Sequence, residues 1–394
     1  MFAILILQLL FWLAIFLVFH SYVLFPKILE VLARNKKQNQ NIWDLTDRDL
    51  PGVDILMAVY NEEKVIREKI LSLVETNYPL EKINIYIGSD ASTDKTDDII
   101  HELIQSYPQI KLFRYSRTGK SGIINQLYKE SNSDVIVLTD ANVFFEIDTI
   151  YHLTKHYKNE TIGLIGGNIV NPDFKKTGIS FQEKKYLERE NRIKYLEGIC
   201  MGGMIGAFGG CYSLRRELFV EVPEKWLVDD FFIAMQVLRK DKKTINELSA
   251  ICTEDVSNKI SEEFRRKVRI SAGNFQNLFT FLDLLSPLKF GIAFCFISHK
   301  VLRWITPFLL IGLFIVNLLL LSSGYGIYTL TFIGQIAVML CVLLDRVFKK
   351  IGLHSRILRF ITHFYTMNFA LLVGFINYSK GVKTTIWKPT ERNQ

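Results

Sequence analysis

The stretch Val135-Ile-Val-Leu-Thr-Asp140-Ala-Asn142 decides the fold, because four apolar residues and a threonine lead directly to a carboxylate. Such a run predicts a short buried strand that carries an acid at its carboxyl end. In open α/β sheets, ligands bind beyond the carboxyl ends of the strands. The alternative interpretation is that Asp140 only caps the following turn. The same arrangement recurs elsewhere in the chain, and this repetition favours a binding site.

Segments with strand and helix patterns alternate around this stretch. Short apolar runs predict strands, and segments with helical periodicity lie between them. This alternation predicts an α/β domain with a mostly parallel, doubly wound sheet, as in nucleotide-binding domains. The predicted strands cover residues 53–60, 83–88, 110–115, 135–140 and 163–170, and the predicted helices cover residues 62–75, 94–105, 121–130, 180–197 and 232–239.

Both ends of the chain are apolar enough to enter a membrane. Of the 394 residues, 49% are hydrophobic, and they concentrate at the two ends. The run from Phe2 to about Leu24 is long enough to cross a bilayer. It lacks the basic start and the cleavage site of a signal peptide, which indicates an uncleaved anchor. Near the other end, residues 287–303 predict an interfacial helix, and residues 305–321 and 330–344 predict membrane spans.

The positions of the basic residues predict the orientation in the membrane. Lysines and arginines follow the first apolar run, so the next domain is expected in the cytoplasm. We predict a multi-pass protein of the inner cell membrane with an anchor (residues 1–25), a cytoplasmic domain (26–283) and a part with interfacial and transmembrane helices and a basic tail (284–394). The apolar stretch 360–376 leaves two alternatives. Either it does not fully cross, which we prefer, or the tail violates the positive-inside rule.

The net charge and the cysteines exclude some classes of function. The formal charge is +8, but no basic helix or aromatic RNA-binding motif accompanies it, so no nucleic-acid partner is expected. Much of the surplus lies beside the apolar segments, which indicates contact with a lipid bilayer. The five cysteines have no CxxC spacing, and this favours reduced thiols over zinc ligands or disulfides.

Polar side chains follow three of the predicted strands. Tyr60 and Glu62 lie at the end of the first strand, Asp90 follows the second, and Asp140 and Asn142 lie at the end of the fourth. Asp90 is placed to accept a hydrogen bond from a nucleoside. Oxygen ligands of this kind suit Mg²⁺ or Mn²⁺, which share their coordination with phosphates. The sequence therefore predicts a metal and diphosphate site at this edge of the sheet.

Further segments supply charges that group transfer requires. Lys120 follows a glycine at a predicted helix start, where it can meet a phosphate, although the Walker spacing is absent. The pair Asp229-Asp230 precedes a helix, and repulsion between the carboxylates can raise one pKa, as a general base requires. A helix cap explains one of these acids but not readily both. The cations in residues 263–269 are either a solvated charge run or a clamp on a leaving diphosphate.

Together these motifs resemble a membrane-bound family 2 glycosyltransferase, of the group that includes hyaluronan, cellulose and poly-N-acetylglucosamine synthases. The resemblance covers about Pro51 to Asn274. The motifs that carry it are Val59-Tyr-Asn-Glu62, Ser89-Asp-Ala-Ser-Thr-Asp94, Gly119-Lys120, Thr139-Asp-Ala-Asn142, Gly209-Gly-Cys-Tyr-Ser-Leu-Arg-Arg216 and Val228-Asp-Asp230. It implies a GT-A fold, a nucleotide diphosphate sugar as donor (UDP-linked by expectation) and a role in polysaccharide biosynthesis.

The resemblance also implies roles for individual residues. Tyr60, Glu62 and Asp90 would contact the nucleoside, and Lys120 would lie near the nucleotide. Asp140, with Asn142, would hold the diphosphate through Mg²⁺ or Mn²⁺. Asp230 would be the base that takes the proton of an acceptor hydroxyl, so that the sugar is transferred with inversion. The diphosphate would also contact two arginines, Arg266 and Arg269.

Two departures from the family pattern leave alternatives open. The usual Asp-x-Asp metal motif is Asp140-Ala-Asn142 here, so one ligand is in doubt. The processive synthases carry Gln-x-x-Arg-Trp, whereas this chain has Ile270 after Arg269. The acceptor is therefore a growing glycan or a lipid-linked intermediate that receives a single sugar. A non-catalytic sugar-nucleotide-binding subunit of a polysaccharide assembly is the third alternative, and the intact Asp90, Asp140 and Asp230 argue against it.

Overall fold

The computed structural model describes residues 2–170, 179–254, 260–353 and 355–382, with the backbone alone for 179–185 and 260–262. The chain divides into two compact units. The sheet unit comprises Leu29–Lys259, Phe279–Cys295 and Val382–Gln394, and the helical unit comprises Met1–Ile28, Ile260–Leu278 and Phe296–Gly381. Each unit is described by itself.

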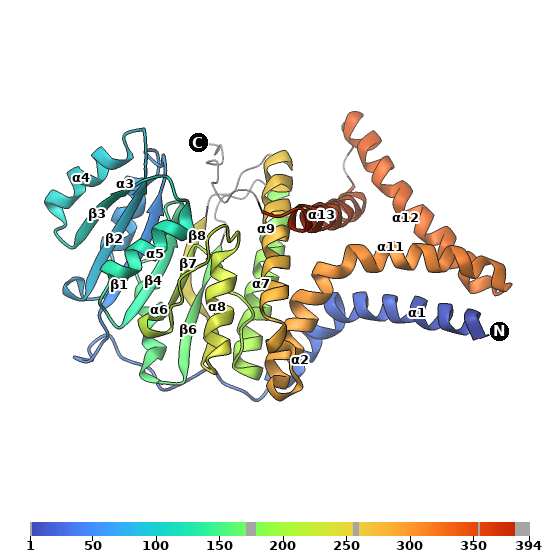
Figure 1. Cartoon of the computed structure of the whole chain (residues 1–394), viewed down its shortest axis with the longest axis horizontal. Coiled ribbons are helices and arrows are strands. Elements are labelled where there is room, and N and C mark those ends of the chain that lie inside the picture. Colours follow the sequence, from blue (N-terminus) through green and yellow to red (C-terminus); the bar gives the residue numbers. More distant parts are fainter. Residues whose placement is uncertain (1, 171–178, 255–259, 354, 383–394) are drawn as a thin grey trace. The chain divides into compact units, whose positions relative to one another are not determined.

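The sheet unit is built on a mixed sheet whose eight strands, within the described residues, have the order β3-β2-β1-β4-β7-β6-β8-β5 (Figure 1). The pairs β1–β2, β2–β3, β1–β4 and β6–β8 are parallel. Strand β7 lies antiparallel between β4 and β6, and β5 pairs antiparallel with β8. The strands are β1 (Val53–Val59), β2 (Ile83–Asp90), β3 (Ile110–Tyr115), β4 (Val135–Asp140), β5 (Val143–Phe145), β6 (Ile162–Val170), β7 (Cys211–Arg215) and β8 (Lys243–Glu254).

Helices cover both faces of this sheet because its central strands are apolar on both sides. On β2, Ile85 and Ile87 face a core that includes residues of α3, α4 and α6. Gly88 faces α5 on the other side, where a Cβ would lie 2.3 Å from the side chain of Ile123. The helices of this unit are α3 (Ile66–Val74), α4 (Thr96–Ser106), α5 (Lys120–Glu130), α6 (Thr149–Thr154), α7 (Ile179–Met201), α8 (Asp229–Arg239) and α10 (Phe290–Cys295).

The helical unit contains long apolar helices. Phe11 packs with Leu320 and Tyr328, and the Ser271 hydroxyl donates a hydrogen bond to the Leu371 carbonyl. By length and composition, four helical segments of the described residues can cross a membrane: Phe2–Ala33, Pro287–Ser323, Gly326–Lys350 and Arg356–Ser379. The main helices are α1 (Phe2–Phe19), α9 (Ile260–Thr280), α11 (Leu302–Leu320), α12 (Gly326–Lys350) and α13 (Arg356–Ser379). The helix α2 (Phe25–Ala33) joins the two units, and the last two residues of α9 belong to the sheet unit.

The prediction of a mostly parallel α/β sheet flanked by apolar helices is confirmed. The element bounds agree closely; for example, β3 and β4 coincide with the predicted strands at 110–115 and 135–140. The sequence reading did not include β5, β7 or β8, and β7 makes the centre of the sheet antiparallel. The predicted interfacial helix at 287–303 continues without a break into α11, and residues 360–376 lie within the 24-residue helix α13.

Candidate active site

The carboxyl ends of β1, β2 and β4 bring the predicted donor-site residues to one edge of the sheet. These three strands are parallel and adjacent, with Val59 opposite Ser89 and Ala58 opposite Asp140. Tyr60 therefore follows β1 at the same edge where β2 ends in Asp90 and β4 ends in Asp140. The fold thus explains why acids that are distant in the sequence lie at neighbouring positions.

Asp90 holds the loop that precedes α5. Its carboxylate is only 2% exposed and lies 2.5 Å from Arg117 Nη1. The backbone N–H groups of Thr118 and Gly119 donate to the same carboxylate, at 2.7 Å from Oδ1 and 3.1 Å from Oδ2 respectively. The Arg117 guanidinium also stacks on the ring of Tyr60, 3.2 Å from its centre. Asp90 and Tyr60 together position a cationic loop at this edge.

The loops after β1 and β2 are tied together by side-chain hydrogen bonds. The backbone N–H of Glu62, a residue only 6% exposed, donates to Thr96 Oγ1 at 2.8 Å. Asn61 adopts a left-handed conformation with φ of 53° and accepts a hydrogen bond from the Thr93 N–H at 2.8 Å. Asp94 caps its own turn by accepting from Thr96. This network fixes where Tyr60 and Glu62 lie.

Lys120 begins α5 and links the carboxylates of two different elements. Its Nζ lies 2.6 Å from Asp140 Oδ1 and 3.9 Å from Asp229 Oδ2. Burial lowers the pKa of Lys120, but the attraction of Asp140, Asp229 and Asp230 outweighs it and raises the pKa above the ordinary value. Lys120 is therefore a permanent cation among three acids.

Asp230 lies in the first turn of α8, and its carboxylate is a stronger base than that of an ordinary aspartate. Burial and repulsion by Asp229 raise its pKa to about 6, although Lys120 and the N–H of Phe231 act in the opposite direction. The backbone at Gly209 approaches it closely, because a Cβ there would lie 3.0 Å from Asp230 Oδ2. The glycine-rich segment thus packs against the acid and leaves it half-buried.

Two buried polar atoms beside these acids have no hydrogen-bond partner within the described part of the chain. They are Asp229 Oδ2 and Tyr212 Oη. Burial raises the pKa of Tyr212 well above its ordinary value, and the three acids Asp140, Asp229 and Asp230 raise it further. A buried polar atom without a hydrogen bond is costly, and such atoms mark a place where a ligand or a cation completes the site.

The turn that follows β4 is held from two sides. Asn142 donates through Nδ2 to Glu254 Oε1, 3.4 Å away at the end of β8. Lys69 of α3, which is fully buried, donates to Thr139 Oγ1 at 2.8 Å and to the Val143 carbonyl. Burial lowers the pKa of Lys69 to about 7. The sequence reading missed both Lys69 and Glu254.

Arg266 and Arg269 belong to the helical unit, in α9. Arg266 Nε lies 3.6 Å from Glu263 Oε2, one turn earlier in the helix, and Arg269 is exposed. The structure therefore brings seven of the nine predicted residues to one unit (Tyr60, Glu62, Asp90, Lys120, Asp140, Asn142 and Asp230), and the two arginines are described separately.

Comparison with known proteins identifies the family of the domain that contains this edge of the sheet. Residues 54–222 match the model of the family "Glycosyl transferase family 2". The chain carries a family 2 glycosyltransferase domain. This domain contains Tyr60, Asp90, Lys120 and Asp140, and Asp230 follows it within the same unit.

Curated relatives match over parts of their length. A probable glycosyltransferase of Bacillus subtilis is 34% identical over 30% of this chain and 29% of its own. A beta-monoglucosyldiacylglycerol synthase of Nostoc is 34% identical over 29% of this chain and 25% of its own. The poly-beta-1,6-N-acetyl-D-glucosamine synthase of Staphylococcus aureus is 22% identical over 65% and 60%. The chain thus spans between a quarter and three fifths of these relatives.

One solved structure resembles the fold over nearly the whole chain. It is a mannosyltransferase from Pyrobaculum calidifontis, determined in complex with GDP-Man and Mn²⁺. The TM-score is 0.68 with 18% sequence identity, and the match covers 94% of this chain and 99% of that one. At this identity the likeness establishes the GT-A fold, which confirms the predicted fold class.

Proposed function

We propose that this protein is an inverting glycosyltransferase that moves a sugar from a nucleotide diphosphate sugar to a hydroxyl group of an acceptor at the membrane. The observation that carries the proposal is the convergence of Lys120, Asp140, Asp229 and Asp230 beside the carboxyl ends of β1, β2 and β4. The family 2 domain supports the reaction class. The residue roles that follow are part of this proposal.

Donor recognition is assigned to the edge formed by β1 and β2. The loops that carry Tyr60, Glu62 and Asp90 are pre-formed, so little conformational entropy is lost when a nucleoside binds between them. Asp90 already accepts two backbone N–H groups and an arginine, so its main effect is to hold this loop in place. Lys120 and Arg117 add two cations where the diphosphate would lie.

A divalent cation, Mg²⁺ or Mn²⁺, fits the residues present. The donors at the β4 turn are the oxygens of Asp140 and Asn142, with Glu254 next to Asn142, and hard cations prefer such ligands. Among the described residues, no group of three or more His, Cys, Asp or Glu side chains could hold a metal without the substrate's help. Asp140 and Asn142 would therefore hold the ion together with diphosphate oxygens, where it would neutralise charge on the leaving group.

Asp230 is proposed as the general base. Its pKa of about 6 keeps it largely ionised at neutral pH and leaves it basic enough to accept a proton. It takes the hydroxyl proton of the acceptor while the acceptor oxygen forms a bond to the anomeric carbon. The bond from that carbon to the diphosphate breaks, and its electron pair leaves with the nucleoside diphosphate. Lys120 stabilises the charge that develops there.

The helical unit supplies the membrane part of the proposal. Its long apolar helices suit a multi-pass protein, and we propose the inner cell membrane with the sheet unit in the cytoplasm. The domain limits of 1–25, 26–283 and 284–394 remain part of this proposal, as does a diphosphate contact by Arg266 and Arg269. The acceptor is proposed to be a glycan or a lipid-linked intermediate in polysaccharide biosynthesis.

Single addition is the second candidate, and one observation favours it. Ile270 stands where the processive synthases carry tryptophan after the arginine, so an aromatic platform for an acceptor sugar is missing from the sequence. Curated relatives include both a poly-N-acetylglucosamine synthase and a glucosyldiacylglycerol synthase. Sizing the product separates the two alternatives, because a polymer and a single sugar differ greatly in mass.

The test is nucleotide release by the detergent-purified full chain. UDP- and GDP-sugars are supplied with Mg²⁺ or Mn²⁺ and with membrane lipid extract as acceptor, and Asp230→Asn serves as the inactive control. Release from one donor that the variant lacks supports the proposal and names the sugar. Nucleotide binding is measured in parallel by calorimetry. Failure to bind any nucleoside diphosphate would contradict the proposal, and binding without release by any donor would favour the non-catalytic subunit.

A further inference from the structure

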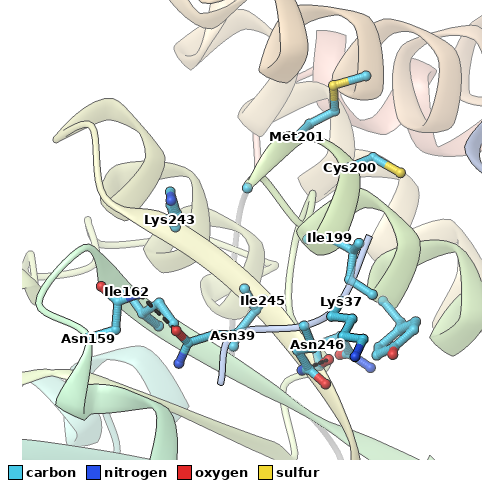
Figure 2. Close-up of a pocket in the computed structure, with 14 residues that line it drawn as sticks. Lys37, Asn39, Asn159, Ile162, Ile199, Cys200, Met201, Lys243, Ile245 and Asn246 are labelled. Atoms are coloured by element: carbon cyan, nitrogen blue, oxygen red, sulfur yellow. Dashed lines mark hydrogen bonds between the residues drawn. The ribbon is translucent and has the colours of Figure 1, made fainter. Parts of the chain in front are cut away.

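A cavity with both polar and apolar lining lies in the sheet unit, apart from the carboxylates. Its volume is about 390 Å³. Figure 2 shows that the linker after α2, the end of α7 and the start of β8 surround it. The polar and charged residues that line it include Lys37, Asn39, Asn159, Lys243 and Asn246.

The cavity is at the opposite end of the sheet from the proposed active site. Ile162 begins β6 and Lys243 begins β8, and both line the cavity. These strands run parallel to each other, and β8 ends at Glu254 beside Asn142. At about 3.3 Å per residue, the eight steps along β6 separate its ends by roughly 26 Å. A ligand in the cavity would therefore not share the donor site.

The cavity is positively charged and rich in amides. No acidic residue is among the 14 that line it, whereas Lys37 and Lys243 are both present and exposed. In the parts of the chain that the structure describes, neither lysine forms an ion pair with a carboxylate. Gln38, Asn39, Asn159 and Asn246 add side-chain amides. Two cations without a neighbouring acid favour an anionic ligand.

Asn246 gives an independent indication of a missing ligand. The residue is only 1% exposed, yet neither Oδ1 nor Nδ2 has a hydrogen-bond partner among the described residues. A buried amide without partners costs free energy, and a polar ligand at the cavity would remove that cost. The linker is fixed beside it, because Gln38 Nε2 donates to the Asn246 carbonyl at 3.2 Å.

The surroundings of the cavity point to lipid as the source of the anion. Cys200 lines the cavity, and its Sγ lies 3.5 Å from the carbonyl of Leu29 in α2. Two residues further along α2, Val31 is 56% exposed. On the other side, Met201 packs against Gly291 of α10, and the neighbouring Phe290 is 70% exposed. Exposed apolar side chains beside cations are typical of surfaces that contact a bilayer.

We propose that this cavity binds the phosphate of an anionic membrane lipid. Lys37 and Lys243 would pair with the phosphate, and the amides of Asn159 and Asn246 would donate to phosphate or glycerol oxygens. Asn39 would hold Asn159 in place, because its Oδ1 accepts a hydrogen bond from Asn159 Nδ2 at 2.9 Å. The acyl chains would lie along the exposed apolar residues of α2 and α10. This site is separate from the sugar-transfer site, so the proposal stands or falls independently of the proposed function.

The experiment measures lipid binding to the full chain in an uncharged detergent. Fluorescent phosphatidylglycerol is titrated and followed by anisotropy, with phosphatidylcholine and inorganic phosphate as competitors. The variant is Lys37→Ala/Lys243→Ala, whose two positions are exposed, so folding should be kept. The matched control is Lys111→Ala/Lys129→Ala, which removes the same charge from other parts of the sheet unit. Unfolding temperatures of all three proteins verify that they are folded.

We expect phosphatidylglycerol to bind the wild type and the control equally, and to bind the cavity variant about 30-fold more weakly, from two lysines near an anionic headgroup. Phosphatidylcholine should compete poorly. Equal affinity for the cavity variant and the wild type would overturn the proposal. Competition by inorganic phosphate as strong as that by the lipid would also overturn it, because the ligand would then be a free anion.

Discussion

Replacing Asp230 with asparagine should stabilise the sheet unit while it abolishes sugar transfer. Asp230 is an acid whose pKa is raised from 3.8 to about 6 by burial and by Asp229. The folded state therefore holds a proton that the unfolded state has lost between these two pH values, and the stability falls as the pH rises through this window. Above about pH 6 the full cost of the buried charge is present.

The magnitude follows from the shift. Two pKa units correspond to about 3 kcal/mol, and the partial exposure of Asp230 reduces the expected gain in unfolding free energy to about 2 kcal/mol. Asparagine keeps an Oδ1 that can accept from the Phe231 N–H, so that hydrogen bond is retained. For a unit of this size, about 2 kcal/mol raises the unfolding temperature by roughly 4–8 °C.

The assay is thermal unfolding of the purified full chain at pH 7 and at pH 4. The gain should appear at pH 7 and largely vanish at pH 4, where the carboxyl group is protonated in the folded wild type. Asp98→Asn is the control, because Asp98 is an exposed acid in the first turn of α4 and its replacement should cost up to about 1 kcal/mol. An unfolding temperature of Asp230→Asn at or below that of the wild type at pH 7 would refute the raised pKa.

The pKa of Asp230 also predicts the pH dependence of turnover. The wild-type kcat/KM, measured by nucleotide release, should rise with pH up to about 6 and then level off. A flat profile would exclude Asp230 as the base. Lys69→Met should raise the metal concentration needed for half-maximal activity about tenfold, because Lys69 holds both sides of the Asp140 turn. The unfolding temperature should change little. An unchanged metal requirement would contradict this prediction. Gly209→Ala should lower kcat more than donor affinity, since its Cβ would press on Asp230; equal loss of both would argue against that contact.

The presence of the first four strands could be predicted because each is a short apolar run that ends in polar residues, and a helix follows each of the first three. Their order in the sheet depends on the tertiary structure, since β4 lies beside β1 although β3 precedes it in the sequence. Strand β7 could not be found in this way. Cys211–Arg215 is five residues long and lies between β4 and β6 only because of contacts with residues more than 40 positions away. Such a pairing leaves no local signal.

The residues of the candidate site likewise divide into those that the sequence pattern reveals and those that depend on the tertiary structure. Asp90, Asp140 and Asp230 stand at ends of elements, where the sequence pattern exposes them. Lys69 is different, since it lies inside a helix, although a local signal existed: Ile66, Ile70 and Leu73 are buried on α3, and Lys69 falls on that same apolar face. A lysine at such a position must meet a buried acceptor, and here the acceptors come from β4 and β5.

The pairing of Asn142 with Glu254 accounts for the departure of this chain from the Asp-x-Asp pattern. Two carboxylates at positions 140 and 142 would lie in one turn, with Glu254 as a third acid beside them. Asparagine at 142 instead donates a hydrogen bond to Glu254, so β8 delivers a carboxylate to the turn without an unpaired charge next to it. The number of acids near the proposed cation is thus kept at two, although one of them now comes from a strand that is more than 100 residues later in the sequence. For this reason the loss of the second aspartate does not by itself argue against a metal-dependent transferase.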